Sequence, residues 1–291
     1  MRNRTFLIIC ATLALSGVLA AVPSVASAQQ RLQFPSVDGE LTGGAPTQLD
    51  GYLYRPSGAG PFPAVVAMHG CGGLFAPRDK SRLASRNVDW GTRLSKLGYV
   101  ALFPDSFNPR GKPEVCKQQD QTLILPGRHR VADAYGALAW LQKQPFVQPG
   151  AIALMRWSHG GITTLWASRR SSRARPKDVQ TDFALGIAMY PGCVAILETD
   201  YAPAFPVQMF VGDRDDWTPA APCKTFAEKA GLKIVAYPNA HHGFDAPDQA
   251  KLVLTGIRST KSGTATIGTD PAARADVLKR VPQILATMQG R

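Results

Sequence analysis

At 291 residues, of which 45% are hydrophobic, the chain is long for one domain, but α/β folds of this size commonly form a single unit. The formal net charge of +12 is mild for a nucleic-acid-binding protein, and the Lys and Arg residues are scattered apart from a run at 169–177. No nucleic-acid motif accompanies that run, so we interpret it as a solvated helix end and loop and expect no nucleic-acid partner. A basic surface favours association with anionic cell envelopes or with acidic substrates.

The N-terminal segment has the features of an export signal. Arg2 and Arg4 precede an apolar run from Phe6 to Val22, and the small residues Ala26–Ala28 offer a cleavage site. An uncleaved membrane anchor is the alternative, but the run is barely long enough to span a bilayer and the cleavage site argues against it. We expect residues 1–28 to be a signal peptide and the mature protein to be periplasmic or extracellular, without stable membrane insertion.

Four cysteines remain after this segment: Cys71, Cys116, Cys193 and Cys223. An even number of cysteines in an oxidising compartment favours disulfides. Metal ligation is the alternative, but no C-x-x-C pair or Cys/His cluster has zinc-site spacing, so we expect no metal and no cofactor. We expect Cys71 to pair with Cys116 and Cys193 with Cys223, because each pair lies on loops that leave neighbouring predicted strands.

Residues 29–291 alternate between strand-like and helix-like segments. The Gly- and Pro-rich residues 29–62 predict leading strands. Apolar, β-rich runs then alternate with helical patterns, at residues 63–70, 99–106, 151–157, 183–192, 206–213 and 233–240. This alternation predicts one α/β domain, with a mostly parallel sheet of about eight strands and helices on both faces. Asp270 is expected to cap a last helix, which Pro282 should kink or end early.

Ser158 lies between a predicted strand and a predicted helix. The apolar run 151–155 precedes it and residues 159–168 can continue as a helix, a setting that holds a serine on a strained turn with its hydroxyl exposed. Gly160 and Gly161 suit the close packing of such a turn. An ordinary turn serine is the alternative, because an S-x-G match alone is common.

An acid and a base follow Ser158 in the chain. A serine nucleophile needs a base to remove its proton and an acid to orient that base. Asp215 lies three residues after Gly212 on the loop leaving one predicted strand, and His242 lies on the loop leaving the next. All three loops would meet at the carboxyl edge of one parallel sheet, where open α/β sheets bind ligands. The order Ser, Asp, His is that of the α/β-hydrolases, and we expect these residues to form a catalytic triad.

Neighbouring residues compete for two of these roles. Asp213 and Asp216 are alternatives to Asp215, and His241 adjoins His242. Spacing to the flanking glycines favours Asp215 and His242. Asp216 is best explained as the cap of the helix that follows it.

Backbone N–H groups beside the nucleophile are expected to form an oxyanion hole. The carbonyl oxygen gains negative charge during acyl transfer, and each preorganised N–H group stabilises it by about 3 to 4 kcal/mol. One donor should be the N–H of His159, and the second that of Cys71 in the glycine-rich loop 69–73. The side chains of His69 and His159 are then expected to be structural and not catalytic bases.

Several stretches spread over the mature chain carry a family resemblance: GYLYRP, GPFPAVVAMHGCGGL, FPDSFNPRG, WSHGG, YPGC, VGDRDDWTPAAPC and HHGF. Through them the chain from about Leu32 to Ala286 resembles the dienelactone hydrolase family of α/β-hydrolases, in particular its exported branch. The resemblance implies a single-domain hydrolase that cleaves small esters or lactones with the nucleophile, acid and base named above. The founding members use a cysteine nucleophile where this chain has Ser158, which argues against dienelactone itself as the substrate.

Arg156 stands where the turn before such a nucleophile usually has glycine. Because that preference is steric, we expect Arg156 to be tolerated, with its guanidinium reaching solvent or an acidic partner and Gly160 and Gly161 supplying clearance. One alternative is a catalytically inactive hydrolase fold kept as a binding protein, with Arg156 as a symptom of decay. A peptidase of the same superfamily is another. The intact triad argues against the first, and the lack of an accessory domain argues against the second.

The substrate pocket is expected to be open. Only the short segment Cys193–Phe205 lies where many lipases insert a large lid. We therefore expect a water-accessible site for a small-molecule ester or lactone with short or soluble acyl groups. The loops 106–127 and 244–269 should shape the pocket, and no feature predicts an oligomeric state.

Overall fold

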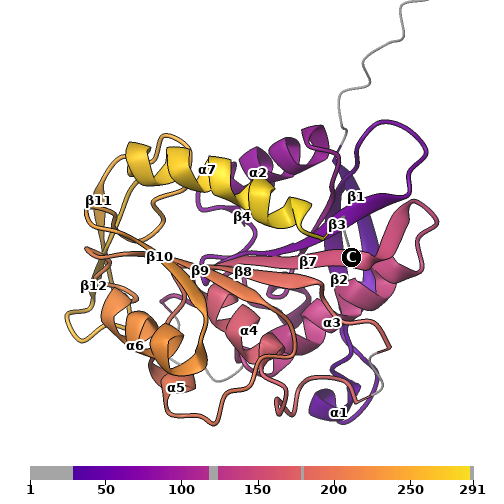
Figure 1. Cartoon of the computed structure of the whole chain (residues 1–291), viewed down its shortest axis with the longest axis horizontal. Helices are drawn as coiled ribbons and strands as arrows, with labels where there is room; N and C mark the ends of the chain where they lie inside the picture. The colour runs from indigo at the N-terminus through magenta and orange to yellow at the C-terminus, as the bar shows by residue number, and fades with distance from the viewer. Residues whose placement is uncertain (1–28, 118–123, 178–179, 289–291) are drawn as a thin grey trace, which may run out of the picture.

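A computed structural model describes residues 29–117, 124–177 and 180–288, and an eight-stranded sheet runs through its centre (Figure 1). The strands lie in the order β1 (Gln30–Pro35), β2 (Gln48–Tyr54), β6 (Val100–Pro104), β3 (Phe62–Met68), β7 (Val147–Trp157), β8 (Leu185–Met189), β9 (Val207–Gly212) and β10 (Lys233–Tyr237). β2 pairs antiparallel with β1 and β6, and every other neighbouring pair is parallel. The mostly parallel sheet is therefore confirmed, whereas the expected signal peptide lies outside the described residues.

Helices cover both faces of the sheet, and Figure 1 shows α2 and α7 over one face and α3, α4 and α6 over the other. The helices are α1 (Gly39–Thr42), α2 (Ser85–Lys96), η1 (Asn108–Arg110), α3 (His129–Gln142), α4 (His159–Ser168), α5 (Val194–Leu197), α6 (Ala220–Ala230) and α7 (Pro271–Ala286). Two hairpins complete the fold, β4 (Phe75–Ala76) with β5 (Asp79–Leu83) and β11 (Leu252–Thr255) with β12 (Thr264–Ile267). Only α5 interrupts the connection from β8 to β9, so no large lid stands there.

The central strands are buried on both faces, which explains their continuous apolar sequence. Along β3, Val65 and Ala67 pack in the layer beneath α2 and α7, while Ala64 and Val66 pack in the layer beneath α3 and α4. Side chains on β7 alternate in the same way, with Leu154 on the side of α3 and α4. Arg156, two positions after Leu154, therefore points into the closed layer beneath α3 and α4 and not into solvent.

Helix α7 begins as expected but does not end early. The Asp270 carboxylate accepts a hydrogen bond of 2.8 Å from the N–H of Ala273, which caps the first turn. The helix continues through Pro282 to Ala286. Proline removes one backbone hydrogen bond, and the buried Val281 and Leu285 on either side hold the last turn against the sheet.

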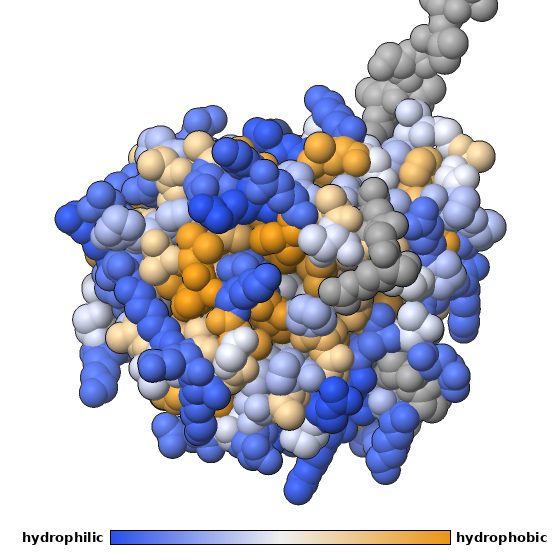
Figure 2. Space-filling model, in the orientation of Figure 1, coloured by the Kyte–Doolittle hydropathy of each residue, from blue (hydrophilic) through white to orange (hydrophobic). Residues whose placement is uncertain are grey.

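The surface is largely polar. Figure 2 shows hydrophilic residues over most of one face, with apolar residues gathered near its middle. Across the described residues, no helix is both long enough and apolar enough to cross a membrane. In the same part of the chain, His, Cys, Asp and Glu side chains form no group of three or more suited to a metal ion.

Candidate active site

Ser158 occupies a strained turn between β7 and α4. Its backbone angles, φ 55° and ψ −121°, lie outside the regions that residues with a Cβ normally adopt. A Cβ on Gly160 would lie 2.7 Å from the Met68 carbonyl oxygen, so only glycine lets α4 approach β3 this closely. A Cβ on Gly70 would lie 3.4 Å from the Ser158 Cβ, which places the loop after β3 directly beside the serine.

The structure brings Ser158, His242 and Asp215 together at the carboxyl edge of the sheet. The Ser158 Oγ lies 2.8 Å from His242 Nε2, and His242 Nδ1 lies 2.7 Å from Asp215 Oδ2. The carboxylate is fully buried and the histidine side chain is only 5% exposed. Three residues from the loops after β7, β9 and β10 thus form one continuous line of hydrogen bonds.

The Asp215 carboxylate is held from several sides. Its Oδ1 accepts hydrogen bonds from the N–H groups of Trp217 at 2.9 Å and Thr218 at 2.8 Å. The Thr218 hydroxyl lies 3.0 Å from Oδ2 and donates to the Tyr190 carbonyl oxygen at 3.0 Å. The sequence analysis missed Thr218, although a threonine three residues after an aspartate is a recognisable side-chain turn.

The competing residues have other partners. Asp213 forms an ion pair of 2.7 Å with Lys224. The Asp216 carboxylate accepts from the N–H and the hydroxyl of Thr266, both at 2.7 Å, and so ties the loop after β9 to β12. The expectation that Asp216 caps α6 is therefore wrong, because no side chain caps that helix at Pro219.

A buried carboxylate, Asp245, anchors the loop that carries His242. The indole N–H groups of Trp90 and Trp157 donate to its Oδ2 at 2.8 and 2.7 Å, and the Tyr190 hydroxyl donates to its Oδ1 at 2.7 Å. Trp157 ends β7 and Tyr190 follows β8, so Asp245 ties the histidine loop to the ends of two central strands. Position in sequence alone did not indicate this role.

Arg130 on α3 braces the two segments that carry the expected oxyanion donors. Its guanidinium donates to the His69 carbonyl oxygen at 2.7 Å and to His159 Nδ1 at 2.9 Å. Phe107 packs between these groups, with its ring centroid 4.5 Å from that of His69 and 5.0 Å from the Arg130 guanidinium carbon. Because His159 is the first residue of α4, its N–H has no partner within the helix and can bind an anion.

The His69 side chain is buried and that of His159 is partly buried. Loss of hydration lowers the pKa of both well below the usual value, and the nearby Arg130 cation acts in the same direction. His69 Nδ1 lies 2.8 Å from the Gly70 carbonyl oxygen, and its Nε2 accepts from the Ser106 N–H at 3.3 Å. Both rings are thus neutral members of the scaffold. Neither contacts Ser158 Oγ as a base, since His242 occupies that position.

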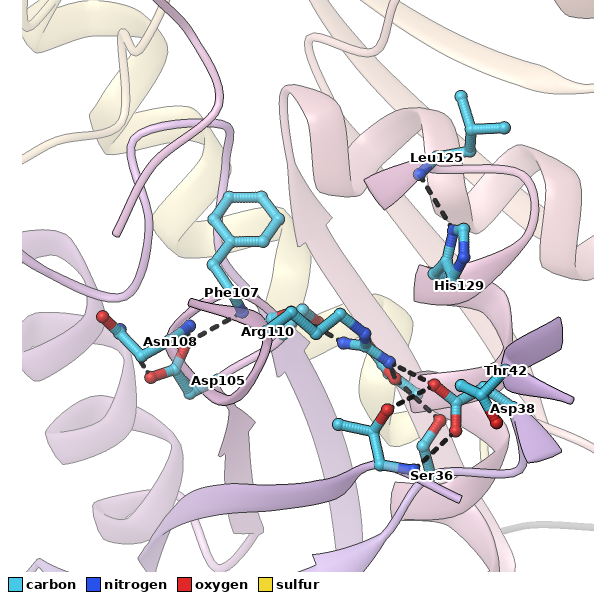
Figure 3. Close-up of polar contacts among 12 residues, drawn as sticks. Ser36, Asp38, Thr42, Asp105, Phe107, Asn108, Arg110, Leu125 and His129 are labelled. Atoms are coloured by element: carbon cyan, nitrogen blue, oxygen red, sulfur yellow. Dashed lines mark hydrogen bonds and ion pairs between the residues drawn. The ribbon is translucent and has the colours of Figure 1, made fainter. Parts of the chain in front are cut away.

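The loop after β6, which carries Phe107, is fixed by an ionic network (Figure 3). Arg110 forms ion pairs of 2.7 Å with both Asp38 and Asp133, whose carboxylates are fully buried. Asp105 accepts from the Phe107 N–H at 3.0 Å and so closes the turn that starts η1. The network connects the N-terminal strands, this loop and α3 at the base of the site.

A comparison with known protein families assigns the chain to one of them. The model of the dienelactone hydrolase family matches residues 49–289, which is most of the chain. The chain belongs to the dienelactone hydrolase family.

Individual members of the family and of its fold agree with this assignment. A Synechocystis protein named "Putative carboxymethylenebutenolidase" is 26% identical over 223 residues, which cover 70% of this chain and 84% of that protein. The dienelactone hydrolase-like promiscuous phosphotriesterase P91, from metagenomic libraries, shares the fold with a TM-score of 0.61 at 21% identity, covering 90% of this chain and 99% of that one. Esterase 2 of Thermogutta terrifontis, solved as its tabun adduct, has a TM-score of 0.57 at 18% identity, covering 92% of this chain and 98% of that one. The family supports hydrolase activity on esters or lactones.

Arg156 is the feature of this dienelactone hydrolase family member that the sequence analysis placed wrongly. The residue is fully buried, and within the described part of the chain none of its three guanidinium nitrogens has a hydrogen-bond partner. Burial lowers its pKa well below the usual value, Arg130 lowers it further, and Asp133 raises it. The guanidinium reaches neither solvent nor a paired carboxylate, because the central strand β7 is covered on both faces. Gly160 does supply the expected clearance, since a Cβ there would lie 3.3 Å from the Arg156 Cβ.

Two disulfides fix loops at the carboxyl edge, with the pairing expected from the sequence. Cys71 is bonded to Cys116, and the Cys71 carbonyl oxygen also accepts from the Val115 N–H at 2.8 Å. Cys193 is bonded to Cys223 and joins the segment after β8 to α6. The first disulfide therefore holds the loop of one expected oxyanion donor, and the second holds the segment after β8 against α6.

Proposed function

We propose that this chain is a serine hydrolase that cleaves small carboxylic esters or lactones through an acyl-enzyme intermediate. The observation that carries the proposal is the line of hydrogen bonds from Ser158 Oγ to His242 Nε2, 2.8 Å, and from His242 Nδ1 to Asp215 Oδ2, 2.7 Å. Nucleophile and base lie within hydrogen-bond reach, and the base is oriented by a buried acid. The membership of the dienelactone hydrolase family supports the same reaction class.

In the proposed reaction, Ser158 Oγ attacks the carbonyl carbon of the ester while its proton passes to His242 Nε2. The negative charge that develops on the carbonyl oxygen is stabilised by the N–H groups of Cys71 and His159. The intermediate collapses, the C–O bond breaks and the leaving alkoxide takes the proton from His242. Water then attacks the acyl-enzyme with His242 as base, which releases the acid and restores Ser158. With a lactone, the leaving hydroxyl stays attached to the acyl group.

The packing of the site favours an active enzyme over an inactive binding protein. The Oδ1 of Asp215 accepts hydrogen bonds from two backbone N–H groups, and this leaves Oδ2 oriented toward His242. Asp245 fixes the histidine loop through three further hydrogen bonds. Preorganisation of this kind is what acyl transfer needs, and simple ligand binding does not require it.

We also propose that the protein is exported and that its mature form is one domain beginning at Gln29. Strand β1 begins at Gln30, one residue after the expected start of the mature chain, and pairs with β2 from its first residue. Two disulfides support an oxidising compartment. Determination of the N-terminal residue of the secreted or periplasmic protein tests this proposal.

Steady-state hydrolysis of p-nitrophenyl esters and small lactones by the mature chain, with matched variants, tests the function. His242→Gln and Asp215→Asn should each lower kcat by several orders of magnitude, because the triad acts as a unit. His241→Gln and Asp213→Asn change the neighbouring residues in the same way and should retain kcat within about threefold, since neither contacts Ser158. Equal losses in both members of a pair would overturn the assignment, and a folded parent without activity on any ester or lactone would overturn the function.

A further inference from the structure

A pocket of about 500 Å³ lies beside the proposed triad. Its lining comes from the loop before α3, from α4, from the segment after β8 and from the loop after β9. Thr218 belongs to the lining, and its hydroxyl lies 3.1 Å from His242 Nδ1. The volume is typical of a small-molecule site, and a substrate held at Ser158 can extend into it.

Two tryptophans line this pocket and are held in place by the fold. Trp166 lies on α4, where Gly127 packs so closely that a Cβ would lie 3.1 Å from the indole ring atoms. Trp217 follows β9, donates its indole N–H to Ser259 Oγ at 2.9 Å, and has its ring centroid 4.7 Å from that of His242. Both indoles are therefore positioned before a ligand binds.

Two polar groups of the lining, on Thr218 and Leu125, are already engaged. The Thr218 hydroxyl donates to the Tyr190 carbonyl oxygen at 3.0 Å, and the Leu125 N–H donates to His129 Nδ1 at 3.3 Å (Figure 3). Among the described residues that line the pocket, Arg128 is the one charged residue, and it is exposed. The interior thus offers apolar contact and indole surfaces to a ligand, with little to satisfy a buried polar group.

We propose that this pocket binds an aromatic ring in the acyl or the alcohol portion of the ester, and that Trp166 determines the preference for that ring. An indole attracts a second aromatic ring in offset-stacked or edge-to-face geometry because of the ring quadrupole, in addition to the burial of apolar area. A saturated ring of similar size is buried equally well but lacks the quadrupole. The proposal rests on the proposed ester hydrolysis and adds the substrate class.

Paired esters that differ only in ring saturation measure this preference. Ethyl 3-phenylpropanoate against ethyl 3-cyclohexylpropanoate tests the acyl side, and 2-phenylethyl acetate against 2-cyclohexylethyl acetate tests the alcohol side. Two methylene groups separate each ring from the reacting bond, so the members of a pair have nearly equal intrinsic reactivity. We expect kcat/KM to favour the phenyl ester about tenfold in one of the two arms, equivalent to about 1.4 kcal/mol.

Trp166→Leu should reduce the ratio of kcat/KM for the phenyl ester to that for the cyclohexyl ester to between one and two, mainly by raising KM for the phenyl ester. Trp140→Leu is the matched control, because Trp140 on α3 packs against Phe34 on β1 and does not line the pocket. The phenyl preference should survive in Trp140→Leu. Calorimetric titration of Ser158→Ala with the same four esters measures binding without turnover and should show the same preference in Kd.

The outcomes separate the two proposals. Hydrolysis of all four esters with no phenyl preference in either arm would overturn the aromatic pocket and leave the hydrolase intact. A phenyl preference that persists in Trp166→Leu would overturn the role of Trp166. If no ester were hydrolysed, equal affinities of phenyl and cyclohexyl esters for Ser158→Ala would overturn the pocket as well, whereas tighter binding of a phenyl ester would support the pocket alone.

Discussion

Replacing the buried Arg156 with methionine should stabilise the protein. The guanidinium lies in the closed layer between β7 and the helices α3 and α4, and within the described residues it has no hydrogen-bond partner. A buried ion costs several kcal/mol in lost hydration unless partners compensate. Here the Asp133 carboxylate stabilises the charge of Arg156 and the Arg130 cation destabilises it, so the lost hydration is only partly compensated.

The size of the gain follows from two opposing effects. Exchanging a buried ion pair or triad for apolar residues of similar volume often stabilises by about 1 to 4 kcal/mol, and we take the same range for Arg156, whose guanidinium has no hydrogen-bond partner among the described residues. Methionine fills the space of the Arg156 stem but leaves that of the guanidinium, and we take the resulting cavity to cost about 1 kcal/mol. The expected net gain in the free energy of unfolding is therefore about 0 to 3 kcal/mol, and each kcal/mol corresponds to about 2 to 4 °C in Tm. Arg156→Gly should be less stable than Arg156→Met, because it empties the whole side-chain volume.

Urea denaturation of the oxidised mature chain measures the effect, with Arg110→Met as the contrasting control. Arg110 is a partly buried arginine paired with two fully buried carboxylates, Asp38 and Asp133, so its loss should destabilise by about 3 to 5 kcal/mol. Arg156→Met should also keep ester hydrolysis within about tenfold of the parent, or about 1.4 kcal/mol of barrier. A less stable Arg156→Met would refute the reasoning, and restored activity in an otherwise inactive protein would favour the inactive binding protein.

Three further outcomes are expected. Because the pKa values of His69 and His159 are lower in the folded protein than in the unfolded chain, the unfolded state binds more protons below about pH 6.5. Stability should then fall by up to about 1.4 kcal/mol per pH unit for each histidine. Urea denaturation from pH 7.5 to 5 should show a shallower fall in His159→Gln, and an unchanged slope would contradict this. Arg130→Met should lower kcat about 10- to 100-fold with KM within about threefold, and should weaken a boronic acid inhibitor by the same factor as kcat; a rise in KM alone would show that Arg130 does not position the oxyanion donors. Replacing Cys193 and Cys223 together by serine should cost up to about 3.6 kcal/mol of stability for the closed loop of 30 residues, and equal midpoints in urea would count against that disulfide.

The proximity of the three residues of the proposed triad could be predicted because each one follows a strand of recognisable pattern. Once the chain is seen to alternate strands with helices, Ser158, Asp215 and His242 must meet at one edge of the sheet. The sheet and the two disulfides follow from the same topology. Local spacing also separated Asp215 from its neighbours, although it misjudged Asp216, whose partner on β12 is fifty residues away in sequence.

The buried surroundings could not be predicted, because they depend on which face a side chain takes and on partners from distant elements. Arg156 is polar and was expected to reach water, but strand alternation and the cover of α3 leave it no route. Arg130 acts on groups that lie in other elements, and nothing near it in sequence marks that role. Trp166 and Trp217 become two surfaces of one pocket only when α4 and the loop after β9 are placed side by side.

Stoichiometric labelling with a fluorophosphonate, followed by peptide mapping, tests the proposed serine mechanism most directly. We predict one phosphonyl group per mature chain, attached to Ser158, with labelling strongly slowed in His242→Gln and unchanged in His241→Gln. Ester hydrolysis should be lost in proportion to the label. A label on any other residue, or ester hydrolysis that persists in fully folded Ser158→Ala, would contradict the account.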